Sequence, residues 1–249
     1  MAEVMLDPNR ERQRFGDVVI RAGVPLPDPR TTDAVLSLAA LGQWLERNGH
    51  AVRGSVLDLG CGRAPYRAWL SRRAASVVAV DVGLWPGVDV VADAHHLPFR
   101  DRCFDTVFCT ELLEHVSDPR RVSEEVARVL SPGGHALVTV PFVYPLHESP
   151  YDFQRFTHFG LRNMLEEAGL EVETLNAQGG PLLLVTQLTL LLAGRGLRPG
   201  APRGPITRFT SFAQSVFVRA QGTLYRSTNH AAGLFSLGYM AVARKPSSE

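Results

Sequence analysis

Two acidic side chains in the first half of the chain stand where they could meet a ligand. Asp58 lies in the apolar run 55–59, just before the turn 60–62 with its two glycines, and Asp81 ends the next apolar run. Glycine lets the backbone turn tightly and approach a bound molecule. A carboxylate here suits a cationic ligand better than a pyrophosphate, and a second carboxylate can accept both hydroxyls of a ribose. The pattern favours an adenosine ligand with a positively charged tail and no phosphates.

The two glycines alone do not decide the ligand, because any α/β protein can use glycine after a strand. A dinucleotide fingerprint would place glycine or alanine at the position of Pro65 and would not need an acid at Asp58. This chain has the acid and lacks the third glycine. A dinucleotide is therefore the less favoured ligand.

A second group of reactive side chains lies in the proline-stiffened segment 141–157, which contains His147, Glu148, Asp152 and Arg155. Histidine is a suitable general base for a hydroxyl acceptor, because its pKa lies near neutrality. We expect His147 to take the proton, with Glu148 or Asp152 orienting it and Arg155 forming a structural pair or meeting an anionic acceptor. The alternative is that Asp152 and Arg155 only pin the loop and that His147 caps it.

Short apolar runs alternate with amphipathic segments along most of the chain. The runs predict strands over 55–59, 76–80, 88–91, 106–109, 135–140, 170–175 and 234–243. The helical spacing of apolar residues predicts helices over 31–48, 65–73, 119–130 and 157–168. Continuous apolar strands that alternate with helices are typical of an α/β fold with a doubly wound parallel sheet covered on both faces. Ligands bind such sheets at the carboxyl ends of the strands, where Asp58 and Asp81 are expected.

Several motifs in order resemble those of the class I S-adenosylmethionine-dependent methyltransferases. From Leu57 to Pro141 the chain reads LDLGCG, VAVD, ADAHHLPF, FDTVFCTELLEHV and VLSPGGHALVTVP. The resemblance implies S-adenosyl-L-methionine as cofactor and a Rossmann-like, seven-stranded, mostly parallel sheet with an antiparallel last strand. The segment HESPYDFQRFT over 147–157 is also similar to one in methyltransferases of bacterial glycan and secondary-metabolite pathways.

The resemblance also implies which residues hold the cofactor. The methionine part falls to Asp58, Gly60 and Gly62, with Cys61 between them, the ribose to Asp81, and the adenine edge to Asp93 and Ala94. Glu111 stands with Glu114 and His115 in the loop that borders the methyl group in that family. Glu114 and His115 could equally be helix-capping or surface groups. The family's further glycine is replaced here by Ala64-Pro65-Tyr66.

We expect a single domain over residues 1–249. Its parts are an N-terminal helical segment over 1–50, a cofactor-binding core over 51–175, a helical insertion or lid over 176–232, and the last strand with a tail over 233–249. The insertion contains an apolar run over 181–193 that is too short for a membrane span of about 20 residues. This run is expected to be either a buried lid over the acceptor site or a segment at a membrane interface.

The formal net charge of +1 hides an asymmetry. Between Thr174 and Ser248 the chain has no Asp or Glu but eight Arg and Lys residues. Such a region either faces an anionic partner or is a solvated basic face. A helix expected over 206–226 would carry arginines beside an apolar stripe. Such a helix either rests on anionic lipid or packs on its own domain, and the second interpretation is favoured. We expect no nucleic-acid partner, because Thr110-Glu111-Leu112-Leu113 stands where base amino methyltransferases have an Asn/Asp-Pro-Pro-aromatic sequence.

The three cysteines, Cys61, Cys103 and Cys109, are odd in number and lack metal-ligand spacing, so we expect neither a disulfide framework nor a metal site. Residues 1–15 lack the apolar stretch of a secretory signal, so a cytoplasmic location is expected. The chain is expected to be an enzyme that transfers methyl from S-adenosylmethionine to a small molecule or glycan, most often at oxygen. Two alternatives stay open: a lipid-linked or carrier-bound anionic acceptor at a membrane surface, and a protein that binds the cofactor without methyl transfer.

Overall fold

A seven-stranded sheet dominates the described part of the chain, residues 18–21, 24–27, 35–196 and 235–247 of a computed structural model. Its strands are β3 (Ser55–Leu59), β4 (Ser76–Asp81), β5 (Val90–Val91), β6 (Phe104–Thr110), β7 (Leu130–Pro141), β8 (Glu171–Ala177) and β9 (Gly238–Arg244). They lie in the order β5-β4-β3-β6-β7-β9-β8. A separate hairpin pairs β1 (Val18–Arg21) with β2 (Val24–Pro27), in a segment that the sequence analysis expected to be helical.

The pairing confirms the predicted topology. β3 is parallel to β4 and β6, and β6 is parallel to β7. β9 is antiparallel to both of its neighbours, β7 and β8, as expected for the last strand. The strand order changes direction between β3 and β6, so the carboxyl ends of these two strands border the crevice in which such sheets bind ligands.

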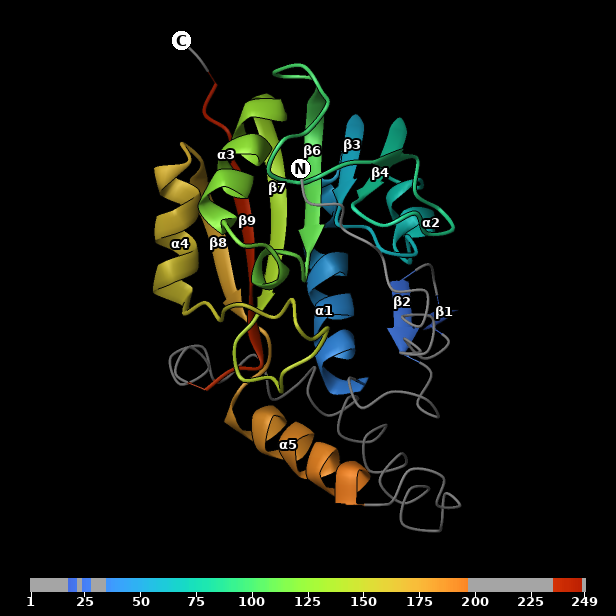
Figure 1. Ribbon diagram of the computed structural model, residues 1–249, viewed down its shortest axis with the longest axis vertical. Coiled ribbons are helices and arrows are strands. Elements are labelled where there is room, and N and C mark those ends of the chain that lie inside the picture. The colour runs from blue at the N-terminus through green and yellow to red at the C-terminus, as the bar shows by residue number, and fades with distance from the viewer. Residues whose placement is uncertain (1–17, 22–23, 28–34, 197–234, 248–249) are drawn as a thin grey trace.

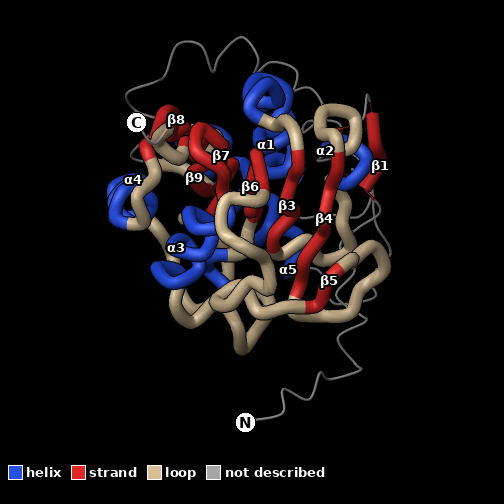
Figure 2. Tube along the Cα trace, turned by 90° about the horizontal axis from the view of Figure 1, so that it is seen from above, coloured by secondary structure: helices blue, strands red, loops and turns tan. Residues whose placement is uncertain are grey.

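Helices cover both faces of the sheet (Figure 2). Those on one face are α1 (Val35–Asn48) and α2 (Arg67–Leu70), and those on the other are α3 (Pro119–Val129) and α4 (His158–Glu167). Alternate residues of one strand feed the two cores, because successive side chains of a strand point to opposite faces. On β3, Val56 packs with Trp44 and Trp69, whereas Leu57 belongs to the cluster that contains Val126 and Leu161. Both faces are therefore buried, which explains the continuous apolar strands.

The ends of two helices follow from their capping residues. Asp118 accepts a hydrogen bond from Arg121 N at the start of α3, and Thr157 accepts one from Gly160 N at the start of α4. The predicted cap at Thr157 is confirmed. The helix predicted over 65–73 is shorter than expected, because Cys61 O and Ala64 O accept turn hydrogen bonds that delay its start to Arg67.

The insertion leaves and re-enters the sheet at one place. Gln178 N donates to Gly238 O at 2.8 Å, Leu237 N donates to Gln178 O at 3.3 Å, and Gln178 Nε2 reaches Ser37 O on the backbone of α1 at 2.9 Å. Just beyond Gln178, the apolar run forms the helix α5 (Pro181–Gly196), while the helix predicted over 206–226 lies outside the described residues. Among the described helices, none combines the length and the hydropathy that a bilayer span requires.

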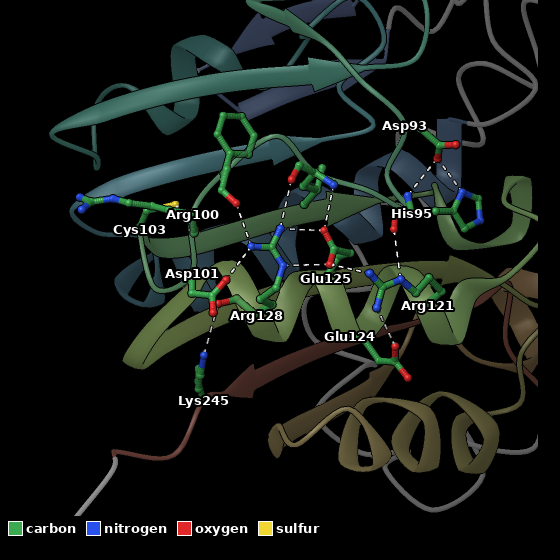
Figure 3. Close-up of polar contacts among 12 residues, drawn as sticks. Asp93, His95, Arg100, Asp101, Cys103, Arg121, Glu124, Glu125, Arg128 and Lys245 are labelled. Carbon is green, nitrogen blue, oxygen red and sulfur yellow. Dashed lines mark hydrogen bonds and ion pairs between the residues drawn. The ribbon is translucent and has the colours of Figure 1, made fainter.

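An arginine on α3 holds the loop that connects β5 to β6 (Figure 3). Arg128 donates to both carboxylate oxygens of Glu125 at 2.8 and 2.9 Å, and to the carbonyl oxygens of Leu97 and Phe99 at 3.1 and 2.8 Å. Glu125 is buried and also accepts a hydrogen bond from Leu97 N at 2.8 Å. The guanidinium lowers the pKa of Glu125, so this carboxylate stays charged and keeps the loop on the helix.

We predict that Arg128→Met will lower the free energy of unfolding by about 2–3 kcal/mol, because a buried carboxylate loses its principal charged donor. Urea denaturation followed by circular dichroism measures this loss. The control is Arg162→Met on α4, which breaks a partly exposed Arg162–Glu166 pair and should change stability by less than about 0.5 kcal/mol. Equal effects of the two substitutions would contradict the role given to Arg128.

Candidate functional site

The polar residues singled out in the sequence gather at the carboxyl edge of the sheet. Asp58 lies near the end of β3, Asp81 ends β4, and Glu111 follows β6 directly. The loop that follows β7 lies at the same edge, in yellow in Figure 1, with α5 beyond it. Parallel neighbouring strands thus place residues from distant parts of the chain at one site.

The turn after β3 is built from backbone hydrogen bonds. Gly60 N and Cys61 N donate to Val80 O at 2.9 and 3.0 Å, and Gly62 N donates to Asp81 Oδ2 at 2.8 Å. Gly62 has φ +53°, and a Cβ placed there would meet no atom within 4 Å. The space beside Gly62 is therefore open to a ligand that approaches the backbone.

Asp58 is buried, and its Oδ2 has no hydrogen-bond partner among the described residues. Burial raises the pKa of Asp58 to about 7, against the charge of Arg67, and the charge of Asp81 raises it further. A buried polar oxygen without a partner is costly unless a ligand satisfies it. The orphaned oxygen therefore fits a ligand that brings a positive charge or a donor.

Glu111 adds a further carboxylate to the same edge. Its Oε1 accepts a hydrogen bond from Thr139 Oγ1 at 2.8 Å, and burial raises its pKa to about 7. Burial raises the pKa of Tyr66, and the charges of Glu111 and Asp58 add to the effect, so both carboxylates lie near this phenol. An edge with three acids, Asp58, Asp81 and Glu111, fits the cationic cofactor that the resemblance implies and disfavours a pyrophosphate.

The other expected cofactor residues lie on two short segments. Cys61 is buried and unpaired with another cysteine, and burial raises the pKa of its thiol to about 12, so it is a neutral side chain. Asp93 accepts a hydrogen bond from His95 N at 2.9 Å, and Ala94 is buried against the core. These two residues open the loop that Arg128 holds.

The loop after β7 brings His147 and Asp152 together. His147 N donates to Asp152 Oδ2 at 2.9 Å, and Nδ1 of the His147 ring lies 3.2 Å from the same oxygen. Arg155 contacts both oxygens of Asp152 and holds the pKa of that carboxyl well below its usual range. Within the described part of the chain, it is Asp152 and not Glu148 that contacts the His147 ring. The same pairs pin the loop, as the alternative expected, and the catalytic role of His147 stays a prediction.

The structure adds Glu114 and His115 to this group, and Glu114 is neither a cap nor a surface residue. Both lie in the short helix η3 (Leu113–His115) after β6, and both carboxylate oxygens of the fully buried Glu114 lack a hydrogen-bond partner among the described residues. Burial raises the pKa of Glu114 well above its usual value. His115 Nε2 lies 3.5 Å and His147 Nε2 lies 3.9 Å from Glu114 Oε1. The only sequence signal was their place just after a central strand.

A cavity of about 600 Å³ opens beside this loop. Its wall combines residues 142–146 and 152–155 with Leu188 of α5. Most of the lining is apolar or aromatic, with the Asp152–Arg155 pair as its charged part. Its volume lies within the range of small-molecule sites, and the cavity opens to solvent.

Comparison with known proteins gives matches over the core. Residues 57–138 match the family model described as "Methyltransferase domain". The methyltransferase GfsG of Streptomyces halstedii is 35% identical over 134 residues, which cover 45% of this chain and 47% of that protein. The ubiquinone biosynthesis O-methyltransferase of Cronobacter sakazakii is 34% identical over 110 residues, 38% of this chain and 45% of that protein. The chain thus matches just under half the length of these relatives.

Solved structures share the fold over nearly the whole chain. The [4+2]-cyclase SpnF superposes with a TM-score of 0.56 at 23% identity, covering 89% of this chain and 85% of its own. A putative sarcosine dimethylglycine methyltransferase from Galdieria sulphuraria gives a TM-score of 0.55 at 17% identity, covering 94% of both chains. At these identities the likeness concerns the fold alone.

The glycine-rich turn contains one alanine in a conformation that favours glycine. Ala64, at the place where the resembled family has glycine, has φ +50°. We predict that Ala64→Gly will raise the free energy of unfolding by about 0.5–1 kcal/mol, because a left-handed alanine costs about 1–2 kcal/mol and glycine's extra freedom offsets part of the gain. The same substitution at the exposed helical Ala68 should instead lower stability by about 0.5–1 kcal/mol. Thermal and urea unfolding of both variants test this difference in sign.

Proposed function

We propose that this chain, whose residues 57–138 match a methyltransferase domain, transfers a methyl group from S-adenosyl-L-methionine to an oxygen atom of a small molecule or glycan. The observation that carries the proposal is the buried, unpartnered carboxylate oxygen of Asp58 at the tip of β3. The match of residues 57–138 to the methyltransferase domain supports it.

In the proposed complex, the residues of the strand edge divide the work of binding. Asp58 neutralises the positive charge of the methionine part, beside the turn at Gly60 and the open backbone at Gly62. Asp81 accepts the ribose hydroxyls while it holds the turn through Gly62 N, and the segment with Asp93 and Ala94 meets the adenine. S-adenosylmethionine supplies, when bound, a methyl group on a positively charged sulfur. Glu111 and the turn with Cys61 complete the wall of this site.

The proposed acceptor site is the cavity beside the loop after β7. Its largely apolar lining offers a surface against which an acceptor can be aligned for in-line displacement. His147, whose ring faces the Asp152 carboxylate at 3.2 Å, is proposed to receive the proton of the acceptor hydroxyl. Glu148 borders this position in the sequence and is kept as a secondary candidate. One relative's name, an O-methyltransferase of ubiquinone biosynthesis, supports transfer to oxygen.

A second candidate is cofactor binding without methyl transfer. It is favoured by one observation: a [4+2]-cyclase has a similar fold, so the fold does not fix the reaction. Incubation with methyl-labelled cofactor and extracts of hydroxylated metabolites separates the two candidates. Label in a product supports transfer, whereas cofactor binding without any demethylated cofactor would favour the second candidate. Mass spectrometry of metabolites that accumulate when the protein is absent identifies the acceptor.

A carrier-bound anionic acceptor at a membrane surface is proposed as the alternative substrate class, with the cytoplasm as the expected location. The exposed Leu182 and Val185 on α5 are the described residues that favour it. Sedimentation with anionic vesicles is the measurement, and α5 variants Leu182→Ser and Val185→Ser should reduce any association. Absence of the wild-type chain from the vesicle pellet would remove this alternative.

Cofactor binding is predicted to release protons below pH 7. In the free protein, Asp58 and Glu111 each have a pKa raised to about 7, so both carry protons at pH 6. A bound cation favours the ionised carboxylates and lowers these pKa values, so binding releases protons at pH 6 and few at pH 8. Calorimetry at both pH values, in buffers with different ionisation enthalpies, counts the protons.

The variant for this test is Asp58→Asn. It should reduce the proton release at pH 6 and weaken binding at pH 8 by about 2 kcal/mol, roughly thirtyfold, because a charged partner of the cofactor is lost. Glu166→Gln on the exposed side of α4 is the matched control and should change neither quantity. Proton release unchanged in Asp58→Asn would refute the assignment of Asp58.

A further inference from the structure

We propose that Glu114, His115 and His147 form a binding site for a divalent first-row transition metal ion, with open positions for an oxygen of the methyl acceptor. Each residue offers one ligand atom, and these atoms lie within 4.8 Å of one another. The role of the ion in catalysis rests on the proposed methyl transfer, whereas the existence of the site does not.

The first support is the environment of the carboxylate. Glu114 is fully buried, and neither of its oxygens has a hydrogen-bond partner among the described residues. Buried charges in proteins are normally paired or bound to a metal. The Nε2 atoms of His115 and His147 lie 3.5 and 3.9 Å from Glu114 Oε1. The carboxylate is thus aimed into a group of metal-binding side chains.

The second support is the orientation of the two imidazole rings. His115 Nδ1 lies 2.8 Å from Tyr151 O, which can only accept a hydrogen bond, so this nitrogen carries the hydrogen. In the neutral ring, Nε2 then presents a lone pair toward Glu114. The His147 ring lies in a similar position, with Nδ1 3.2 Å from Asp152 Oδ2 but without a hydrogen bond, and with Nε2 3.9 Å from the same oxygen of Glu114. Metal-binding histidines show this pattern, in which the other ring nitrogen faces a carbonyl or carboxylate.

The third support is the spacing. Ligands held about 2.1 Å from a tetrahedral ion lie roughly 3.4 Å apart. The two distances from Glu114 Oε1 are 3.5 and 3.9 Å, so small rotations of the side chains would close the site. The rings of His115 and His147 already pack edge to face, with centroids 4.6 Å apart. A backbone hydrogen bond from Phe153 N to Glu114 O, at 2.9 Å, holds the loop after β7 beside η3.

The donor set defines the kind of ion. Two imidazole nitrogens and one carboxylate suit ions such as Mn²⁺, Co²⁺ or Zn²⁺ better than Mg²⁺ or Ca²⁺, which prefer oxygen ligands. Three protein ligands leave positions open, as in catalytic metal sites. An acceptor hydroxyl in such a position loses its proton to solvent more readily. The freed oxygen lone pair then forms the carbon–oxygen bond, while the carbon–sulfur bond breaks and its electron pair stays on sulfur.

This inference revises two expectations from the sequence. The expectation of no metal rested on cysteine spacing, which says nothing about ligands from two different strand ends. With an ion on its Nε2, His147 acts on the acceptor through the ion, and this replaces the direct proton transfer to His147 that is proposed for the protein without an ion. Asp152 then keeps its part as the positioning residue that fixes the His147 ring.

The test uses the untagged full chain, dialysed against a chelator and titrated with Co²⁺. We expect one equivalent of Co²⁺ to bind and to produce the visible absorption bands of a nitrogen- and oxygen-ligated ion. Glu114→Gln, His115→Ala and His147→Ala should each weaken binding by at least about tenfold. His50→Ala, which removes a histidine whose ring meets Arg47 O on the far side of the fold, is the matched control. Unchanged cofactor binding shows that each variant is folded. His147→Ala changes a half-buried side chain in a loop, so it tests the site even if Glu114→Gln fails to fold.

The outcomes separate this inference from the proposed function. Absence of the cobalt bands, or bands that persist in both histidine variants, would overturn the metal site even if methyl transfer is observed. Cobalt binding that depends on all three residues would support the site even if no methyl transfer is found. Where both are found, chelation should abolish transfer without loss of cofactor binding, and added Mn²⁺ or Zn²⁺ should restore it; transfer unaffected by chelation would overturn the role of the ion.

Discussion

Burial of carboxyl groups without internal partners is the constraint on which this structure depends. Asp58 and Glu114 both lie in the interior, and each has at least one oxygen that no described residue satisfies. Such groups lower the stability of the free protein. They are tolerated at the edge of a sheet because a ligand can repay the loss, and this edge is where the fold places open backbone at Gly62 and the histidines of the neighbouring loop.

The rest of the molecule keeps that edge in place. The two cores fix the strands from opposite faces, so that the tips of β3, β4, β6 and β7 stay level. Arg128 holds the β5–β6 loop from the side of α3, and Arg155 holds the loop after β7 through Asp152. In both places a guanidinium bridges a carboxylate and backbone carbonyl oxygens. Each loop is therefore held by the several N–H donors of one planar guanidinium group, a contact that does not itself require apolar side chains to be buried.

The sequence was sufficient for the sheet and for the position of Asp58 and Asp81 at the ends of two neighbouring strands. Apolar runs over 55–59 and 76–80 correspond to β3 and β4, because strands buried on both faces leave an unambiguous signal. The strand predicted over 135–140 in fact begins at Leu130. Its first part was not predicted because residues 131–134 pair irregularly and carry no apolar pattern. The hairpin of β1 and β2 lies in the expected N-terminal helical segment and was not predicted, although proline is allowed in an edge strand.

The surroundings of the loop after β7 were predicted less completely, for a physical reason. Motif spacing reports on residues near one another along the chain, and Asp152 beside His147 was found in this way. The proximity of Glu114 to His147 depends on the pairing of β6 with β7 and on the path of a loop, neither of which spacing encodes. Glutamate is also rarely buried, so the residue type of Glu114 gave no sign that its side chain lies in the interior.

The backbone hydrogen bonds at Gln178 join the insertion to the sheet. The chain departs and returns through the backbone bonds between Gln178 and residues 237–238, and a side chain at Gly238 would collide with Val140 O at 2.4 Å. Both ends of the segment between Gln178 and Leu237 meet at these backbone hydrogen bonds. A segment of different length or chemistry can therefore be exchanged there while the sheet stays in register. A change in that segment can accordingly alter the cavity wall at Leu188 while Asp58 and Asp81 keep their places at the strand ends.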